Sequence, residues 1–184
     1  MAGEVVKLPP GAQELVSSAR VDAGFDALAA DLGPLVAAGN AVLLGVMNGG
    51  LVPLVRLIDR LQGDYSVSYC HVTRYRGQTS GGALEWIRRP ADEVRGRHVI
   101  VVDDVFDAGL TLQDVRHACL EAGAARVTTA VAFVKEVPRD AGIAPPDFTT
   151  GLTLPNRYVF GCGMDLHNRW RQLRGIYALR PESG

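Results

Sequence analysis

The chain has 184 residues, of which 47% are hydrophobic, so it can bury one good core and is expected to fold as a single domain over residues 1–184. Its formal net charge is −1 and its pI is about 6.4, which excludes a global positive field that would attract nucleic acid or anionic lipid. The three cysteines (Cys70, Cys119, Cys162) form neither a disulfide framework nor a CxxC metal pattern, and no apolar run reaches the roughly 18 residues of a membrane span. We therefore expect a cytoplasmic protein with reduced, buried thiols and no membrane partner.

The first quarter of the chain predicts helices and then a strand. Residues 13–38 are rich in Ala, Leu and Val at helical spacing, and Gly24, Gly33 and Pro34 are expected to divide them into two helices. The continuous apolar run at 41–47 predicts a short buried strand, which a glycine turn and an amphipathic helix follow.

The rest of the chain continues this alternation. Strands are predicted at 65–72, 98–102 and 126–134, and the chain is expected to return as a strand over 154–166. The polar, glycine-bearing segment at about 73–90 predicts a mobile loop. Because strands alternate with helices, we expect the α/β class: a parallel sheet covered on both faces, with its ligand site at the carboxyl ends of the strands.

The most informative segment is VIVVDDVFDAGLT, residues 99–111. Asp103 and Asp104 stand where a buried strand emerges, and Asp107 opens a turn of small residues that leads into a helix. By themselves these acids could be solvated loop residues, and Asp107 could simply be an N-cap. The residues that follow decide between these interpretations.

Ala108, Gly109 and Thr111 keep the backbone accessible at a helix start, where N–H groups lack intrahelical partners and the helix dipole favours an anion. A Rossmann fingerprint and a P-loop lysine are both absent, so NAD and a nucleoside triphosphate are not the natural ligands. Carboxylates just before such a cradle can accept hydrogen bonds from a diol. The segment therefore predicts a site for a ribose 5-phosphate.

This segment resembles the PRPP (phosphoribosyl pyrophosphate) motif of the type I phosphoribosyltransferases: four apolar residues, two acids, two apolar residues, Asp, a small residue, Gly, any residue and Thr. The resemblance implies the type I phosphoribosyltransferase fold, a central parallel sheet flanked by helices with a small hood from the terminal parts of the chain. The core would span about 41–135 and the hood about 1–20 and 150–184. The resemblance further implies Mg²⁺ as cofactor and a homodimer or homotetramer.

The resemblance also assigns roles at the ribose phosphate. Asp103 and Asp104 would hold the ribose hydroxyls, directly or through magnesium, and the turn at 107–111 would bind the 5-phosphate. Asp107 is the candidate catalytic residue, as general base at N7 of the base, with a purely electrostatic role left open. The implied PRPP-binding set is Asp103, Asp104, Asp107, Ala108, Gly109, Leu110, Thr111, Asn48, Gly49, Tyr75 and Arg171.

The order of the later segments resembles the hypoxanthine-guanine branch of the family. Taken alone, Lys135 could be a solvated strand-end charge and Tyr158 a core aromatic. The resemblance implies that Lys135 hydrogen-bonds the purine O6, Tyr158 stacks on the base and the Val159 backbone reads its Watson–Crick edge. Asp165 would order magnesium on pyrophosphate, and Arg171 would contact the pyrophosphate. A cationic ammonium favours a carbonyl acceptor, so adenine should be a poor substrate.

The MNGG loop would bind pyrophosphate through its backbone, with a non-proline cis peptide expected between Asn48 and Gly49, although a plain strand-to-helix turn is the alternative. Relatives often have Lys where Asn48 stands, so only a backbone role is carried over. Tyr75 matches the family's mobile loop, whereas Arg74 and Arg76 could contact phosphate or another subunit.

Together these features predict a purine salvage enzyme that transfers 5-phosphoribosyl from PRPP to hypoxanthine and/or guanine, giving IMP or GMP and pyrophosphate. Two alternatives remain open. One is a xanthine-preferring phosphoribosyltransferase, because a lysine at O6 barely separates the 6-oxopurines. The other is a PRPP-fold regulator that binds RNA, which should show a basic face. The near-neutral charge argues against a nucleic-acid partner.

Overall fold

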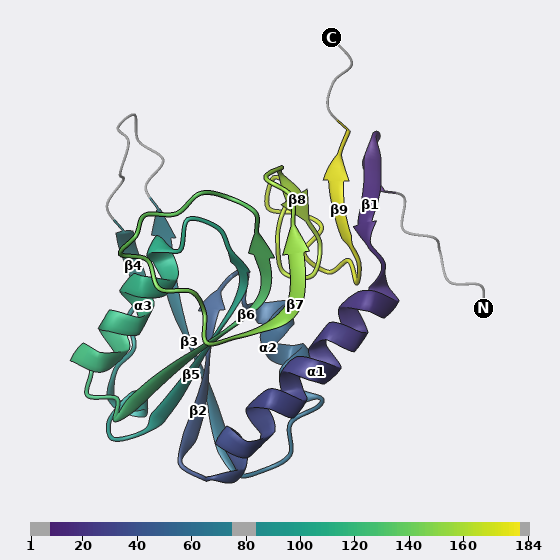
Figure 1. Cartoon of the computed structure of the whole chain (residues 1–184). Helices are drawn as coiled ribbons and strands as arrows, with labels where there is room; N and C mark the ends of the chain where they lie inside the picture. The colour runs from purple at the N-terminus through teal and green to yellow at the C-terminus, as the bar shows by residue number, and fades with distance from the viewer. Residues whose placement is uncertain (1–7, 75–83, 181–184) are drawn as a thin grey trace.

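The computed structural model describes residues 8–74 and 84–180 (Figure 1). The elements follow the order β1 (Ala12–Val16), α1 (Ser18–Ala37), β2 (Ala41–Met47), α2 (Leu51–Ile58), β3 (Tyr65–Arg74), β4 (Leu84–Arg88), a 3-10 turn (Asp92–Val94), β5 (His98–Phe106), α3 (Leu110–Glu121), β6 (Arg126–Lys135), β7 (Phe148–Leu154), β8 (Val159–Phe160) and β9 (Ile176–Leu179). Among these residues, no helix is both long and apolar enough to cross a bilayer.

A six-stranded sheet in the order β4-β3-β2-β5-β6-β7 forms the body of the molecule. Strands β3, β2, β5, β6 and β7 run parallel, and β4 pairs antiparallel with β3. The predicted α/β class is therefore confirmed, but the sheet is mixed rather than wholly parallel. The difference arises because only residues 75–83 separate β3 from β4, whereas a crossover to a parallel strand needs roughly a dozen or more residues.

Helices cover both faces of this sheet, with α1 and α2 on one side and α3 on the other (Figure 1). The alternation of side chains along β2 explains how one strand serves both layers. Leu43 packs with the α1 and α2 side chains, whereas Leu44 packs with the α3 side chains, and both are fully buried. This two-sided burial is why β2 and β5 read as continuous apolar runs.

A second, three-stranded sheet in the order β1-β9-β8 stands above the carboxyl ends of the main sheet, and we call it the hood sheet. Its strands pair antiparallel, and β1 comes from the beginning of the chain whereas β8 and β9 come from its end. A small cluster centred on Phe160, Leu166 and Leu173 forms its own buried core. This hood from the two terminal parts agrees with the predicted fold.

The expected pair of helices over 13–38 is wrong: the segment contains β1 and then the single helix α1. Ser17 begins the helix by accepting a hydrogen bond from the Arg20 N–H at 3.4 Å. Gly24 does not break the helix, because it marks a close approach: a Cβ there would lie 2.9 Å from the Thr150 Cβ. Pro34 lies in the last turn, close to the natural end of the helix.

The strand expected over 154–166 is also wrong, because β7 ends at Leu154 and only Val159–Phe160 forms a strand after it. Gly161, Cys162 and Gly163 have φ values of 101°, 49° and 103°, and this left-handed backbone cannot continue a strand. The strand predicted at 98–102 is correct in type but extends to Phe106. Much of the segment expected as a mobile loop, residues 75–83, lies outside the described residues.

Candidate functional site

The two adjacent acids of the central motif lie inside the last part of β5, where both carboxyl groups are buried. Asp103 and Asp104 are each 9% exposed, which excludes solvated loop residues. One Asp103 oxygen accepts a hydrogen bond from the Asp104 N–H at 2.9 Å, and one Asp104 oxygen accepts from the Val105 N–H at 2.7 Å. The backbone therefore fixes both carboxylates at the carboxyl end of the central strand.

Burial raises the pKa of both acids above its ordinary value. For Asp103 the nearby charge of Asp104 raises the pKa further, because two like charges in a site of low polarity repel. For Asp104 the Val105 N–H and the positive charge of Arg171 oppose the effect of burial. A pair of acids whose ionisation is costly in the absence of a ligand is well suited to hydroxyl groups or a cation.

The turn after β5 leaves the first turn of α3 open toward the same place. Gly109 occupies the N-cap position with φ +83°, and a Cβ there would overlap Ile143 and Phe106. Because glycine has no side chain, the N-cap residue covers none of the N–H groups of the first helical turn, which suit an anion. Asp107 is therefore not the N-cap that the sequence left open.

Asp107 instead pairs with the lysine at the end of the neighbouring strand. The Lys135 ammonium donates a hydrogen bond to an Asp107 carboxylate oxygen at 2.9 Å. The Lys135 side chain is 14% exposed and that of Asp107 is 52% exposed. The two residues with candidate roles at the base thus lie side by side, one presenting N–H donors and the other acceptors.

The MNGG loop approaches the acids from β2. A Cβ at Gly49 would overlap the Asp104 carboxylate, so only glycine allows this approach. The cis peptide bond is Met47–Asn48, not the expected Asn48–Gly49 bond. The two peptide bonds are adjacent, and the residue types of the loop do not indicate which of them is cis.

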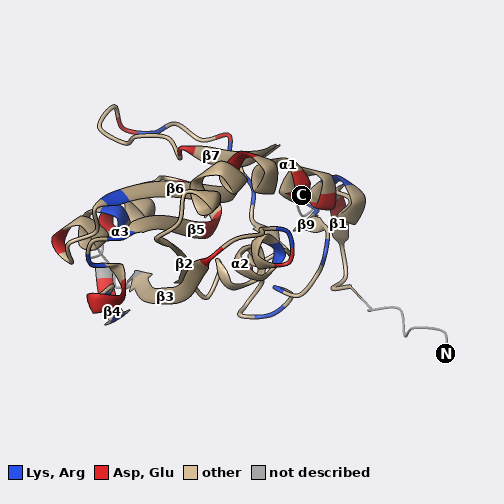
Figure 2. Ribbon diagram, turned by 90° about the horizontal axis from the view of Figure 1, so that it is seen from below, with Lys and Arg blue, Asp and Glu red and all other residues tan. Residues whose placement is uncertain are grey.

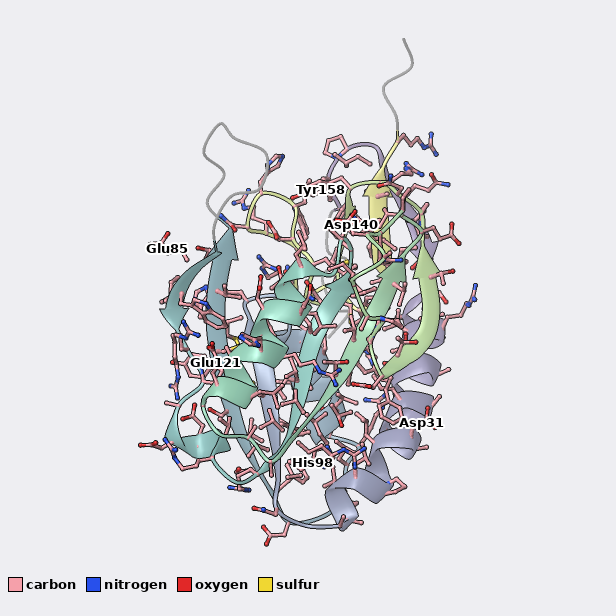
Figure 3. The ribbon with its side chains drawn as sticks, turned by 60° about the vertical axis from the view of Figure 1, so that its left-hand side comes forward. Asp31, Glu85, His98, Glu121, Asp140 and Tyr158 are labelled. Carbon is pink, nitrogen blue, oxygen red and sulfur yellow. The ribbon has the colours of Figure 1, made fainter. Side chains whose placement is uncertain are left out.

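The loop after β8 closes the site from the hood side. Arg171 binds the Asp165 carboxylate at 2.8 Å and donates to the Gly163 carbonyl at 2.6 Å. The other Asp165 oxygen accepts from the Asn168 N–H at 2.8 Å. Tyr158 is 53% exposed and lies at the hood end of the molecule (Figure 3), so it is not a core aromatic.

Three adjoining cavities join these groups into one hollow, which we call the site cleft. The first, of about 400 Å³, lies between the acids and the start of α3; the second, of about 710 Å³, lies between the MNGG loop and the hood; the third, of about 140 Å³, lies at Lys135. Arg171 lines the first and second, Asp104 the first and third, and Tyr158 the second and third. The described candidates that line the cleft are Asn48, Gly49, Asp103, Asp104, Asp107, Ala108, Gly109, Leu110, Thr111, Lys135, Tyr158, Val159, Asp165 and Arg171.

Tyr75 and Arg76 lie outside the described residues, as does the side chain of Arg74. Within the described residues, no group of three or more His, Cys, Asp and Glu side chains is arranged to hold a metal ion. Asp103, Asp104 and Asp165 therefore do not form a ready-made carboxylate cage.

The structure adds residues to the cleft that sequence reasoning missed. His71, Thr73 and His167 line the second cavity, and Arg139, which is not among the residues that line the three cavities, donates to the Lys135 carbonyl. His71 and Thr73 lie on β3, where strand alternation alone could have marked them as facing one side of the sheet. The contacts of Arg139 are to backbone oxygens, which leave no residue-type signal in the sequence.

Acidic and basic residues are interspersed along the ribbon rather than separated by sign (Figure 2).

Comparison with known proteins identifies close resemblances. The family model for the phosphoribosyl transferase domain matches residues 15–165. The chain is 30% identical over 169 residues to hypoxanthine-guanine phosphoribosyltransferase of Streptococcus pneumoniae, covering 91% of this chain and 93% of the relative. It is 29% identical over 153 residues to hypoxanthine-guanine-xanthine phosphoribosyltransferase of Tritrichomonas foetus, covering 83% of each. A crystal structure of a hypoxanthine phosphoribosyltransferase from Staphylococcus aureus shares the fold, with a TM-score of 0.82 at 21% identity over 92% of each chain.

Proposed function

The chain belongs to the phosphoribosyl transferase domain family, and from this premise we propose that it transfers 5-phosphoribosyl from PRPP to a 6-oxopurine, hypoxanthine and/or guanine. The products are IMP or GMP and pyrophosphate. The relatives named above carry this activity in their names. The observation that carries the proposal is the Lys135–Asp107 pair, whose side chains lie 2.9 Å apart. The pair lines the same cleft as the turn at residues 107–111, which is proposed to bind the 5-phosphate.

The ribose 5-phosphate is assigned to the first cavity. The 5-phosphate would accept hydrogen bonds from the N–H groups of residues 107–111, where Gly109 opens α3. The ribose 2- and 3-hydroxyls would donate to Asp103 and Asp104, which lie behind this turn in the same cavity. Hydrogen bonds to these carboxylates would offset the cost of their burial.

The base is assigned to the third cavity. The Lys135 ammonium is a donor only, so it matches the O6 carbonyl of hypoxanthine or guanine and cannot bind the 6-amino group of adenine. The exposed ring of Tyr158 would stack on the base, and the Val159 backbone would read its far edge. Asp107 would lie beside N7, where it can accept a proton.

Pyrophosphate is assigned to the second cavity, between Asn48, Gly49 and Arg171. Since Asn48 lacks a charge, its contribution would come from the backbone, and Arg171 would supply the positive charge. Tyr75 is proposed to close over the same region.

The donor set of the cleft fits magnesium, a hard cation that prefers carboxylate oxygens, waters and substrate phosphates over an all-protein cage. Asp103 and Asp104 would hold a magnesium ion at the ribose hydroxyls. Asp165 would order a magnesium ion on the pyrophosphate. When bound, magnesium neutralises charge that develops on the leaving pyrophosphate.

In the proposed reaction, N9 of the purine attacks C1 of PRPP with inversion as the bond from C1 to the pyrophosphate oxygen breaks. The bonding electrons leave with pyrophosphate, and Asp107 accepts the proton that the purine loses at N7. Arg171 and the backbone donors hold the anions, and no covalent intermediate with the protein is needed. We further propose a cytoplasmic homodimer or homotetramer, in which one domain carries the core and the hood; the three buried free cysteines suit a reducing compartment.

The test is pyrophosphate release from PRPP and magnesium with hypoxanthine, guanine, xanthine, adenine, uracil and orotate offered separately. We expect release with hypoxanthine or guanine and little with adenine or the pyrimidines. If pyrophosphate release is greatest with xanthine, the protein is the xanthine-preferring alternative. The name of the Tritrichomonas foetus relative includes xanthine. If the protein binds PRPP without releasing pyrophosphate and shifts RNA in a salt-dependent manner, it is the RNA-binding regulator and not the enzyme.

A further inference from the structure

Arg139 lies in the loop after β6 and binds three backbone carbonyl oxygens of the site cleft. Its Nε donates to the Asp107 carbonyl at 2.7 Å, and its Nη2 donates to the Phe106 carbonyl at 3.0 Å and to the Lys135 carbonyl at 2.5 Å. These carbonyls stand at the carboxyl ends of β5 and β6. One guanidinium therefore ties together the ends of the two strands that carry the proposed base-contacting residues.

The guanidinium is also held in place from one side by an aromatic ring. It lies 4.4 Å from the ring centroid of Phe106, whose side chain is 3% exposed. A planar fork with fixed N–H directions can reach several carbonyls while it packs on a ring, whereas the tetrahedral ammonium of lysine cannot. The contact set thus depends on arginine specifically.

Lys135 and Asp107 are joined twice as a result. Their side chains meet directly at 2.9 Å, and their carbonyl oxygens accept from the same guanidinium. The direct ion pair opens if the ammonium turns to a purine carbonyl and the carboxylate turns to N7. The backbone link through Arg139 does not depend on that ion pair and can persist when it opens.

We propose that Arg139 is a positioning residue for the base: it holds the Lys135 and Asp107 backbones at a fixed separation while their side chains exchange the ion pair for the purine. Arg139 acts through these two residues and is not assigned a contact with substrate. The kinetic part of this inference rests on the proposed function; the structural part does not.

The kinetic test compares Arg139→Gln with Arg97→Gln as a matched control. Arg97 is partly buried and also donates to two backbone carbonyls, those of Asn40 and Ala41, at 3.1 and 3.0 Å. It precedes His98, which lies at the opposite end of the sheet from Tyr158 (Figure 3). We expect Arg139→Gln to lower kcat/KM for hypoxanthine by about 10- to 100-fold with a smaller change in KM for PRPP, and Arg97→Gln to change neither. Arg139→Lys should fold but fail to restore the loss.

A double-mutant cycle with Lys135→Met separates positioning from general damage. If Arg139 acts through Lys135, then Arg139→Gln should cost much less in the Lys135→Met background than in the unmutated chain. An equal fold-loss in both backgrounds would overturn the proposal.

A readout that needs no turnover keeps this inference distinct from the proposed function. The sequence contains two lysines, Lys7 and Lys135, so acetylation by an N-hydroxysuccinimide ester can be followed at each by peptide mass spectrometry. Relative to Lys7, Lys135 should react faster in Arg139→Gln and at an unchanged rate in Arg97→Gln. An unchanged Lys135 rate in Arg139→Gln would refute the positioning role even if the base assay succeeds, and a faster rate would support it even if no base is used.

Discussion

At the scale of single residues, the buried acids of β5 show how the site departs from what stability alone would select. Asp103 is buried beside Asp104, and burial together with that neighbouring charge raises its pKa well above the ordinary value of 3.8. The folded protein therefore binds a proton at Asp103 more tightly than the unfolded chain does. Such a group lowers stability as the pH rises from about its unfolded pKa through its folded pKa.

Asp103→Asn should consequently raise the free energy of unfolding at pH 7 while it lowers phosphoribosyl transfer. The gain should shrink as the pH falls toward and below 3.8, because Asp103 then becomes protonated in the unfolded chain as well. Urea unfolding between pH 4 and 8 checks this, with the exposed Asp31→Asn on α1 as control. A gain that is constant across that range would show that burial of the charge is not its cause.

The Lys135–Asp107 pair makes a second point about single residues. The family resemblance assigned each residue to a different atom of the purine, and the structure shows that the two side chains also bind each other. The residue types of Lys135 and Asp107 do not predict this contact. The two positions are far apart along the chain and meet only because β5 and β6 end side by side.

At the scale of elements, the turn between β5 and α3 was predicted correctly because small residues and a following helical pattern specify it locally. Gly109 is required twice, once by its positive φ and once by the space that Ile143 and Phe106 occupy. Both requirements fall on the N-cap position of the helix whose first turn is proposed to bind phosphate.

Gly109→Ala should therefore destabilise the protein by about 1–3 kcal/mol and raise KM for PRPP more than KM for the base. Gly96→Ala is the control, because Gly96 also has positive φ but no atom within 4 Å of the added Cβ. Thermal unfolding and steady-state kinetics measure the two effects. Equal KM changes for both substrates in Gly109→Ala would show that the turn does not act at the phosphate.

Short strands that depend on pairing with another strand were predicted poorly. The segment that forms β1 was expected to be helical, yet it pairs with β9 at the other end of the chain. Likewise, β4 was expected to be loop and forms the antiparallel edge of the main sheet. In both cases the pairing with a distant or adjacent strand outweighs the local preference of a few residues.

At the scale of the whole molecule, the two sheets differ in how firmly they are held. Strands β2 and β5 are paired on both sides and covered on both faces, whereas β8 has two residues and pairs on one side only. An ion pair joins the hood to the body: Asp22 on α1 accepts from Arg174 at 3.1 Å, and the Arg174 side chain is 73% exposed. Because exposed ion pairs stabilise weakly, the hood should open more readily than the body.

Native-state hydrogen exchange should accordingly show faster exchange for the amides of β8 and β9 than for those of β2 and β5. Addition of IMP should slow exchange in the hood if the base lies between Tyr158 and Lys135, as proposed. Exchange at one common rate in both sheets would mean that the molecule opens only as a unit.

The sequence by itself determined the α/β class, the central strand and turn of the motif, and the membership of the family, all of which are confirmed. These features depend on residue types that are neighbours along the chain: an apolar run, paired acids and a glycine before a helix. Only the tertiary structure decided the hood pairing of β1 with β9, the Lys135–Asp107 ion pair and the three carbonyl contacts of Arg139. These contacts depend on which distant parts of the backbone the burial of a common core brings together. Every residue has a backbone carbonyl, so the residue types in a sequence do not indicate which carbonyl accepts a given hydrogen bond.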